Sequence, residues 1–361
     1  MPEATAEAAL DTKSEEIHRI ELTVIVPARN EEDCLGACLD SLVSQSSEFF
    51  QLGRDWELLV VDDGSTDRTR SIAESFRNVT VLAPQKLEKG WTGKANACWT
   101  AAERSCGQWL LFSDADTIHE AGNLRRAIHE AEKYNVGVLS YSPKQLVSGL
   151  WQRALMPLVF CELALAYPPE KVSNPELRIA AANGQFLLVK RDAYRALGGH
   201  ASVKGDILED VELAFLAKRR KVGLRFRYAA DALSTRMYRT TGAMIEGWTK
   251  NLALLFGNCL ILAAWRALDI FLLVGVPILA WNYWNYGVWQ LPWFTAGVLL
   301  LLVWLRIVWR FYARVAKSNF PAVDCILSPL ALPLFVVLLY RSWFQNKVLH
   351  RVSWKGRTYP A

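Results

Sequence analysis

The sequence predicts an α/β domain with a mainly parallel sheet, followed by a C-terminal α-helical membrane domain. Two observations predict this fold class: short β-branched runs alternate with helical patterns from residue 21 onward, and the composition changes sharply near residue 244. A length of 361 residues suits one large domain with an appendage, or two domains. We expect a disordered tail at 1–20, the α/β domain at 21–244, membrane segments at 245–346 and a basic tail at 347–361.

The change in composition is one of charge and of tryptophan content. Residues 1–244 carry 30 Lys and Arg against 33 Asp and Glu, whereas residues 245–361 carry 11 against 3. Ten of the fifteen Trp also lie in the second part. Trp and basic side chains gather at membrane interfaces, so this composition indicates a water-exposed domain joined to a membrane domain. The basic residues flank apolar runs and form no hydrophilic stripe, which argues against a nucleic-acid partner.

The first residues and the cysteines bear on the compartment. The seven Cys have no spacing typical of a zinc site, and their scatter suits a reducing compartment. Residues 1–21 are polar and acidic, with no apolar segment typical of a signal peptide. We therefore expect the α/β domain to lie in the cytoplasm.

The α/β pattern runs through five strands and four helices in order. Apolar runs predict strands at 22–26, 57–61, 79–82, 109–112 and 136–139. Helical patterns between them predict helices at 32–44, 67–76, 94–104 and 121–134. Polar signatures follow four elements of this pattern directly, at 27–32, 62–67, 90–96 and 113–117. Ligands of parallel sheets bind at the carboxyl ends of the strands, so all four signatures should meet in one crevice.

The first candidate chemistry is an Asp-x-Asp pair after the apolar run that ends at residue 112. Carboxylates at i and i+2 splay apart on a strand, but on a strand-end turn both Asp114 and Asp116 can face a cation. Oxygen-only ligands suit Mg²⁺ or Mn²⁺, which would bridge a diphosphate. A surface turn or a helix cap is the alternative explanation.

Two further signatures suit a nucleotide. Residues 62–67 are Asp-Asp-Gly-Ser-Thr-Asp. The last three can cap the next helix, so Asp62 and Asp63 are not needed for capping. Their carboxylates could accept hydrogen bonds from a base or from ribose hydroxyls. Lys94 opens a helix after a glycine-containing loop, where it could meet phosphate oxygens or simply be solvated. No glycine fingerprint for a dinucleotide and no P-loop is present.

An acidic pair outside the metal signature supplies a candidate base. Glu209 and Asp210 fall in the first turn of a helical pattern, where they could serve only the helix dipole. A sugar transfer that inverts the anomeric centre needs one carboxylate to take the proton of the acceptor. This pair is the natural candidate.

Taken in this order and spacing, the four signatures resemble the inverting glycosyltransferases of family 2, which have the GT-A nucleotide-sugar-binding fold. The resemblance covers about residues 22–248 and implies a nucleotide-sugar donor, with a UDP-sugar as the expected one. It implies that Asp210 is the general base beside Glu209, and that Asp116 holds the metal with Asp114. The nucleotide contacts implied by the same resemblance are Pro27, Glu31, Asp63, Lys94 and Asp114. Residues 182–185, which include Gly184 and Gln185, match the place where the family forms its sugar and acceptor pocket.

The sequence departs from the membrane-integrated synthases of this family in one motif. Those synthases carry Gln-x-x-Arg-Trp, whereas this chain has Arg236-Met-Tyr-Arg239, from which either arginine could still clamp the diphosphate. The chain looks more like bacterial lipid-directed members, including hopanoid-associated and carotenoid-acid glycosyltransferases, and more distantly like ceramide glucosyltransferase. That similarity implies an enzyme of the bacterial-type inner membrane that glycosylates a hydroxyl or carboxyl of a lipid-like acceptor. A processive polysaccharide synthase and a non-catalytic nucleotide-sugar-binding membrane protein are the alternatives.

The membrane half contains one short and three long apolar segments. Residues 252–265 suit an interfacial helix or half a span, and 267–286, 293–309 and 323–343 are each about long enough to cross a bilayer. Buried core helices are the alternative explanation. Lys250 and Arg266 flank the short segment, so we expect them at the membrane interface.

Basic clusters around residues 306–317 and 347–357 both favour the cytoplasmic side. Pro329 and Pro333 interrupt the last segment, so a re-entrant hairpin would reconcile the two clusters. The tail from Val348 is expected to fold back over the crevice.

Overall fold

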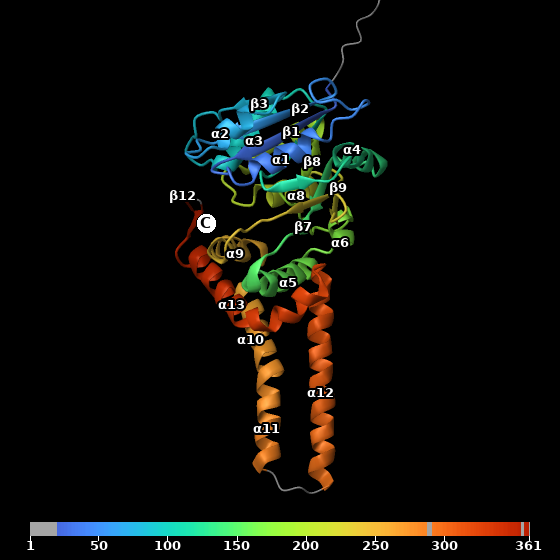
Figure 1. Cartoon of the computed structure of the whole chain (residues 1–361), viewed down its shortest axis with the longest axis vertical. Helices are drawn as coiled ribbons and strands as arrows, with labels where there is room; N and C mark the ends of the chain where they lie inside the picture. Colours follow the sequence, from blue (N-terminus) through green and yellow to red (C-terminus); the bar gives the residue numbers. More distant parts are fainter. Residues whose placement is uncertain (1–19, 287–290, 355–356, 361) are drawn as a thin grey trace, which may run out of the picture.

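The computed structural model describes residues 20–286, 291–354 and 357–360, and its α/β domain sits above a helical part from which two long helices project (Figure 1). The predicted disordered tail, 1–20, lies outside the described residues apart from its last residue. The two parts are joined by short connections, and several helices pack between them.

The α/β domain is built on a seven-stranded sheet with the order β3-β2-β1-β4-β8-β6-β9. The strands are β1 (Leu22–Ala28), β2 (Trp56–Asp62), β3 (Val79–Leu82), β4 (Trp109–Phe112), β6 (Val138–Ser142), β8 (Leu187–Lys190) and β9 (Leu224–Tyr228). β1 pairs in parallel with both β2 and β4, and β8 is antiparallel to both of its neighbours. The predicted mainly parallel sheet is therefore confirmed.

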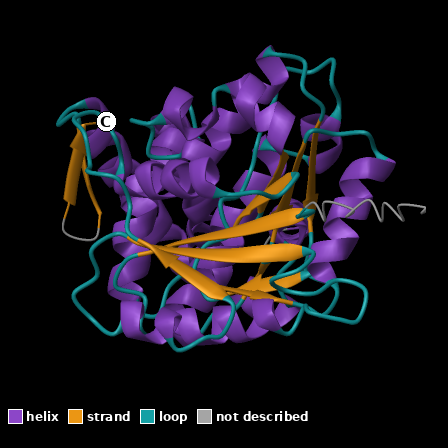
Figure 2. Ribbon diagram, turned by 90° about the horizontal axis from the view of Figure 1, so that it is seen from above, coloured by secondary structure: helices purple, strands orange, loops and turns teal. Residues whose placement is uncertain are grey.

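Helices cover both faces of this sheet (Figure 2). They are α1 (Leu35–Val43), α2 (Thr69–Glu74), α3 (Gly93–Arg104), α4 (Asn123–Lys133), α6 (Pro169–Ser173), α7 (Arg191–Leu197) and α8 (Glu209–Arg219). Two separate hydrophobic clusters result, one on each face, because nearly every residue of the central strands is buried. All predicted strands and helices of the α/β pattern are present, with ends that differ by a few residues.

A second sheet of three very short strands was not predicted. It has the order β5-β10-β7 and consists of β5 (Thr117–His119), β10 (Leu233–Thr235) and β7 (Lys144–Gln145). Runs of two or three residues carry no usable periodicity, so sequence patterns could not reveal them. This small sheet matters because β5 begins directly after the Asp-x-Asp pair.

A third hydrophobic cluster lies between the α/β domain and the projecting helices. It is formed by α5 (Gly149–Ala166), α9 (Thr241–Leu255), α10 (Cys259–Ile270), α13 (Ala322–Lys347) and the end of α12 (Leu291–Val315). Helix α5 falls inside the stretch predicted as the α/β domain, yet its buried face belongs to this cluster. The boundary predicted at residue 244 therefore does not separate two independent cores.

Among the described residues, three helices are long and apolar enough to cross a membrane: Cys259–Asn282, Ala296–Ser318 and Ala322–Lys347. The first runs through α10, a short π-helical turn at Phe271–Gly275 and α11 (Val276–Tyr286), and with α12 it forms the projecting pair in Figure 1. The predicted segment 252–265 is divided between α9 and α10.

The predicted re-entrant hairpin in the last segment is wrong. α13 is one helix that runs through both Pro329 and Pro333 and lies across the ends of the projecting helices, beneath α5 and α9 (Figure 1). In its most apolar 18-residue stretch, 44% of the residues are buried inside the protein, against 17% and 6% in the corresponding stretches of the other two candidate spans. Proline removes a backbone donor and bends a helix, and contacts on several sides can stabilise the bent form.

An ion-pair network ties α5, α10 and α12 together at this junction. Glu162 of α5 pairs with Arg266 of α10 at 2.7 Å, and Arg314 of α12 pairs with Asp269 of α10 at 2.6 Å. Arg266 is 7% exposed, so its guanidinium is buried among these helices. Buried charges are tolerated when they are paired, which explains two acidic residues among apolar helices.

Candidate active site

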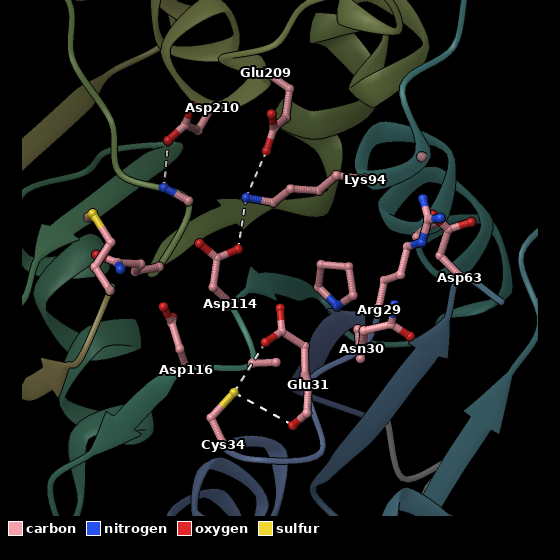
Figure 3. A pocket seen from close by; sticks show the side chains of 18 of the residues that line it. Arg29, Asn30, Glu31, Cys34, Asp63, Lys94, Asp114, Asp116, Glu209 and Asp210 are labelled. Atoms are coloured by element: carbon pink, nitrogen blue, oxygen red, sulfur yellow. Dashed lines mark hydrogen bonds and ion pairs between the residues drawn. The ribbon is translucent and has the colours of Figure 1, made fainter. Parts of the chain in front are cut away.

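A cavity of about 490 Å³ opens at the carboxyl ends of the central strands. Its walls come from the ends of β1 and β4, from the starts of α3 and α8, and from α9. Twelve of the thirteen predicted site residues line it: Pro27, Glu31, Asp63, Lys94, Asp114, Asp116, Gly184, Gln185, Glu209, Asp210, Arg236 and Arg239. Figure 3 shows how several of them point into the same space.

Asp62 is the predicted residue that does not line the cavity. It is 6% exposed, and its Oδ1 accepts a hydrogen bond from the backbone N–H of Ser65 at 3.0 Å. This bond closes the turn after β2, so Asp62 is not surplus to local structure as its sequence position indicated. Asp63, its neighbour, faces the cavity instead.

The loops after β1 and β2 are held to each other by side-chain hydrogen bonds. Asn30 donates its backbone N–H to Ser65 Oγ at 3.0 Å and accepts at Oδ1 from the N–H of Thr66 at 2.9 Å. Asn30 has a φ of 52°, a left-handed conformation that asparagine adopts more readily than most residues. The two signatures, 27–32 and 62–67, therefore form one structural unit that presents Glu31 and Asp63 to the cavity.

Hydrogen bonds from β5 and β10 of the small second sheet hold the backbone of the Asp-x-Asp turn. The N–H of Thr117 donates to the carbonyl of Asp114 at 3.2 Å, and Thr235 Oγ1 of β10 donates to the carbonyl of Asp116 at 3.1 Å. Gln185 Nε2 donates in turn to Thr235 Oγ1 at 3.2 Å. Gln185 thus lines the cavity and also supports the acidic turn through one intermediate residue.

A buried histidine completes this support. His119 Nε2 lies 3.0 Å from Ser113 Oγ, and burial lowers the pKa of His119 to about 3. The imidazole is therefore neutral at physiological pH. Its partners and its absence from the cavity wall make it a structural residue.

Lys94 bridges the two acidic signatures. Its Nζ lies 2.7 Å from Asp114 Oδ1 and 2.9 Å from Glu209 Oε1 (Figure 3). Burial lowers the pKa of Lys94, but the carboxylates of Asp114 and Glu209 raise it by more, and the net result is well above the usual value. The side chain is thus a fixed positive charge between two carboxylates, where phosphate oxygens could compete for it.

Asp210 is held by backbone donors at the start of α8. Gly184 donates its N–H to Oδ2 at 2.5 Å, and the N–H of Val211 donates to Oδ1 at 2.9 Å. Burial, and then the neighbouring carboxylate of Glu209, raise the pKa of Asp210 to about 6. A carboxylate of that basicity is suited to accept a proton near neutral pH.

The glycine at position 184 is required by this arrangement. A Cβ there would lie 2.7 Å from Lys94 Nζ and 3.4 Å from Asp210 Oδ2. We expect Gly184→Ala to fold, because the lysine end can move, but to lower transfer about tenfold by disturbing a charged hydrogen bond. Steady-state kinetics with a melting curve check this, and Gly242→Ala is the control because its Cβ would meet only Thr240 Oγ1 at 3.9 Å. Equal rates for both variants would contradict the assignment.

The donor atoms of the cavity fit a cation that a diphosphate helps to hold. Asp114 and Asp116 offer only oxygen, and within the described residues no group of three or more His, Cys, Asp or Glu is arranged to enclose a metal. Mg²⁺ is usually bound through one or two carboxylates plus substrate phosphates and water, and zinc sites usually have three or four protein ligands. The residues present therefore fit Mg²⁺ or Mn²⁺.

The structure adds three cavity residues from α9, which are Ala243, Lys250 and Asn251. The contact of Lys250 with the cavity was not predicted from the sequence, and its height relative to a membrane stays a prediction. Burial lowers the pKa of Lys250 to about 8. A lysine at the end of an apolar pattern is typical of an interface, and no sequence signal marks the face of α9 that meets the cavity.

At the cavity mouth the two predicted arginines make contacts with neighbouring loops. Arg236 donates to Ser148 Oγ at 2.5 Å, and Arg239 donates to the carbonyl of Asp33 at 2.5 Å. Both line the cavity, and their role towards a diphosphate stays a prediction.

Comparisons with known proteins identify a family to which part of the chain is similar. Residues 23–198 match the family model described as glycosyl transferase family 2. The chain is 26% identical over 356 residues to 4,4'-diaponeurosporenoate glycosyltransferase of Staphylococcus aureus strain MRSA252, which covers 94% of this chain and 88% of that relative.

Two solved structures are also similar to this chain. A mannosyltransferase from Pyrobaculum calidifontis in complex with GDP-Man and Mn²⁺ is 20% identical, with a TM-score of 0.47, over 91% of this chain and 88% of that one. TarS 1–349 of S. aureus in complex with UDP is 17% identical, with a TM-score of 0.42, over 94% and 96%.

The family match spans the sheet from β1 to the end of α7 and contains the Asp-x-Asp turn, Lys94 and the loops that present Glu31 and Asp63. The strand order and the cavity at the carboxyl ends of the strands fit that match. Residues 23–198 are therefore a glycosyltransferase family 2 domain with a GT-A-like α/β fold, and the described residues that follow include three candidate membrane helices.

Proposed function

We propose that the chain is a membrane-bound, inverting and metal-dependent glycosyltransferase that moves a sugar from a nucleotide-sugar, expected to be a UDP-sugar, to a lipid-like acceptor. The observation that carries this proposal is the composition of the cavity. It joins the Asp-x-Asp turn and the pair Glu209–Asp210 to residues of α9, which packs in the helical part. A lipid acceptor needs a cavity that is bordered by the helical part, because only the head group of the lipid leaves the bilayer.

The relative supports an apolar acceptor. Its name assigns it a carotenoid acid, 4,4'-diaponeurosporenoate, and the match covers the helical part as well as the α/β domain. A match confined to the α/β domain would support only the donor half of the proposal.

The donor would bind along the strand ends. Asp63, with the loop that carries Pro27 and Glu31, would hold the nucleoside, and Lys94 would turn from its carboxylates to phosphate oxygens. Asp116 and Asp114 would hold Mg²⁺ or Mn²⁺, which when bound supplies positive charge for the leaving diphosphate. Lys94 and the arginines at the mouth add further positive charge on this side.

Asp210 would act as the general base. Its backbone donors hold it in the cavity wall, and burial, followed by the carboxylate of Glu209, raises its pKa. The acceptor would approach from the side of α9, opposite the nucleotide loops, so that attack on the anomeric carbon inverts its configuration. Asp210 would take the acceptor proton in the same step.

The helical part gives a consistent membrane placement. The projecting pair, α10–α11 and α12, would cross the bilayer and return, and α13 would lie in the interface under the α/β domain. Both ends of α13 then lie on the side of the α/β domain, together with the basic residues at the ends of α12 and α13. The positive-inside rule assigns that side to the cytoplasm, in a bacterial-type inner membrane.

Removing the C-terminal tail should lower activity through α9. After α13 the chain forms a hairpin of β11 (Arg351–Trp354) and β12 (Arg357–Pro360), and β11 packs against α9. A chain ending at Asn346 should transfer about tenfold less sugar, because small displacements of positioning groups are costly. The assay compares it with a chain ending at Pro360, which keeps both strands. Full activity of the shorter chain would remove any role for the hairpin.

The decisive test of the proposed function is transfer of label from a panel of nucleotide-sugars, with purified protein in membranes and Mn²⁺ or Mg²⁺. Label in a discrete lipid is the expected result. Label in a water-soluble polymer would favour a polysaccharide synthase. Tight nucleotide binding without any transfer would indicate a binding protein.

A further inference from the structure

A second hollow lies on the α/β domain, between α4 and the edge strand β9. Its volume is about 690 Å³, and none of its lining residues also lines the cavity with the Asp-x-Asp turn. Five cationic side chains border it, so we call it the basic groove: Arg125, Arg126, Lys133, Arg225 and Arg227. The first three lie on α4 and the other two on β9, so the groove has a basic wall on each side.

Two carboxylates offset only part of this charge. Glu130 accepts a hydrogen bond from Arg225 Nε at 2.6 Å and another from Arg227 Nε at 3.2 Å, so one carboxylate serves two guanidinium groups. Asp231 pairs with Arg227 at 2.8 Å. The side chains that line the groove therefore keep a net positive charge.

Arg225 is held in place while its outer nitrogen atoms stay available. Its Cζ lies 3.6 Å from the centre of the Tyr134 ring, and its Nε is bound by Glu130. Among the described residues, no group accepts a hydrogen bond from Nη1 or Nη2 of Arg225. A guanidinium that is already oriented loses little freedom on binding, and its N–H groups match the oxygen atoms of a phosphate.

The wall formed by α4 carries positive charge that does not stabilise the helix. Arg125 and Arg126 are among the first four residues of α4, which has no acidic residue in its first turn and no side-chain cap at Gly122. The helix dipole is positive at this end, so basic residues are unfavourable there. In the part of the chain that the structure describes, neither arginine side chain has an ion pair or a hydrogen bond. A bound anion would offset these charges.

We propose that the basic groove binds a multiply charged phosphate anion. The site is separate from the nucleotide-sugar cavity and does not rest on the proposed function. The 11 residues of α4 give a wall of about 16 Å at 1.5 Å per residue, which is longer than a single phosphate group. Figure 1 shows α4 and β9 on the α/β domain, away from the projecting helices, which favours a soluble phosphate compound over a lipid head group.

The test is titration calorimetry with inorganic pyrophosphate on the full chain in phosphatidylcholine nanodiscs, without divalent cations. The nucleotide-sugar cavity also contains cationic side chains, so the groove is identified by the binding component that its variants remove. Arg126→Gln and Arg225→Gln should each weaken that component at least about tenfold, the range of a hydrogen bond to a charged group. Added salt should weaken it as well, because the groove is open to solvent.

Arg104→Gln is the matched control. Arg104 is an exposed arginine in the last turn of α3, outside both the groove and the cavity, and its variant should bind pyrophosphate like the unmodified chain. Melting temperatures report folding. Arg225→Gln loses a contact with Glu130 and should melt somewhat earlier, whereas Arg126→Gln removes an exposed side chain and should melt normally. Unchanged pyrophosphate binding in Arg126→Gln, or an equal loss in Arg104→Gln, would overturn the inference.

A second titration distinguishes the two sources of phosphate. In nanodiscs that contain phosphatidylglycerol, a site for a soluble compound should bind pyrophosphate with the same Kd. If phosphatidylglycerol inhibits this binding in the unmodified chain but not in Arg126→Gln, the groove binds a lipid head group through the same residues. Sugar transfer is assayed separately, so a failure of the proposed function would leave this result unaffected.

Discussion

Asp210→Asn is expected to lower the transfer rate about a thousandfold and to leave the Kd for the nucleotide almost unchanged. General base catalysis typically contributes 10²–10⁴-fold, and asparagine keeps the size of aspartate while losing its basicity. The amide oxygen can still accept the hydrogen bond of the Gly184 N–H, so the local backbone should hold. Turnover is measured with labelled donor, and nucleotide binding by calorimetry.

The pH profile gives this prediction a second readout. The base must be ionised to work, and the pKa of Asp210 is raised to about 6 by burial and by Glu209. Turnover should therefore fall as the pH drops through about 6, and the residual activity of Asp210→Asn should lack this acidic limb.

The matched control is Glu212→Gln, in the same first turn of α8. Glu212 is 40% exposed, pairs with Arg219 at 3.7 Å and lies outside the cavity wall. It should keep its rate and its pH profile. A rate within a few-fold of the unmodified chain for Asp210→Asn would transfer the role of base to another group.

Much of the fold can be predicted from the sequence because strands that are buried on both faces appear in it as continuous apolar runs. β1, β2 and β4 read as continuous apolar runs since both faces of the sheet are covered, and their carboxyl ends bring the polar signatures together. The short strands β5, β7 and β10 depend on tertiary pairing, which periodicity does not contain. Yet β5 and β10 donate the hydrogen bonds that hold the carbonyls of Asp114 and Asp116.

The errors at single residues share a physical cause. Asp62 and Asp63 are chemically identical in the sequence, and only the direction of the Ser65 N–H decides that Asp62 closes the turn. Lys250 and Arg266 both flank apolar residues, but one lines the cavity and the other joins a buried ion network. Hydropathy reports that such residues lie near apolar surface and does not report what they face.

The same reasoning applies to α13. Two prolines in an apolar segment favour a break, and a hairpin was the simplest topology that put both basic clusters on one side. The structure reaches the same charge distribution with one bent helix that packs under α5 and α9. The basic clusters therefore predicted on which side the two ends of α13 lie, but they did not predict that one continuous helix connects them.

Asp116→Ala is expected to remove the proposed metal dependence of transfer. Asp116 and Asp114 line the cavity and are the carboxylates proposed to hold the cation with the diphosphate, and charge stabilisation of this kind supplies several kcal/mol. Turnover should drop by about two to three orders of magnitude, since each 1.4 kcal/mol is tenfold. The Kd for UDP should weaken, and added Mn²⁺ should no longer tighten it.

The variant Asp116→Ala should alter metal binding without altering the fold. Its carbonyl accepts the bond from Thr235, which alanine keeps, so the turn should persist and the melting temperature should change little. Glu120→Ala, an exposed acidic residue just after β5, is the control and should titrate with Mn²⁺ like the unmodified chain. An unchanged metal titration in Asp116→Ala would mean that the cation is held elsewhere. If Asp116→Ala loses UDP binding both with and without Mn²⁺, Asp116 contacts the nucleotide directly. Its carboxylate would then be part of the donor-binding site and not a ligand of the metal.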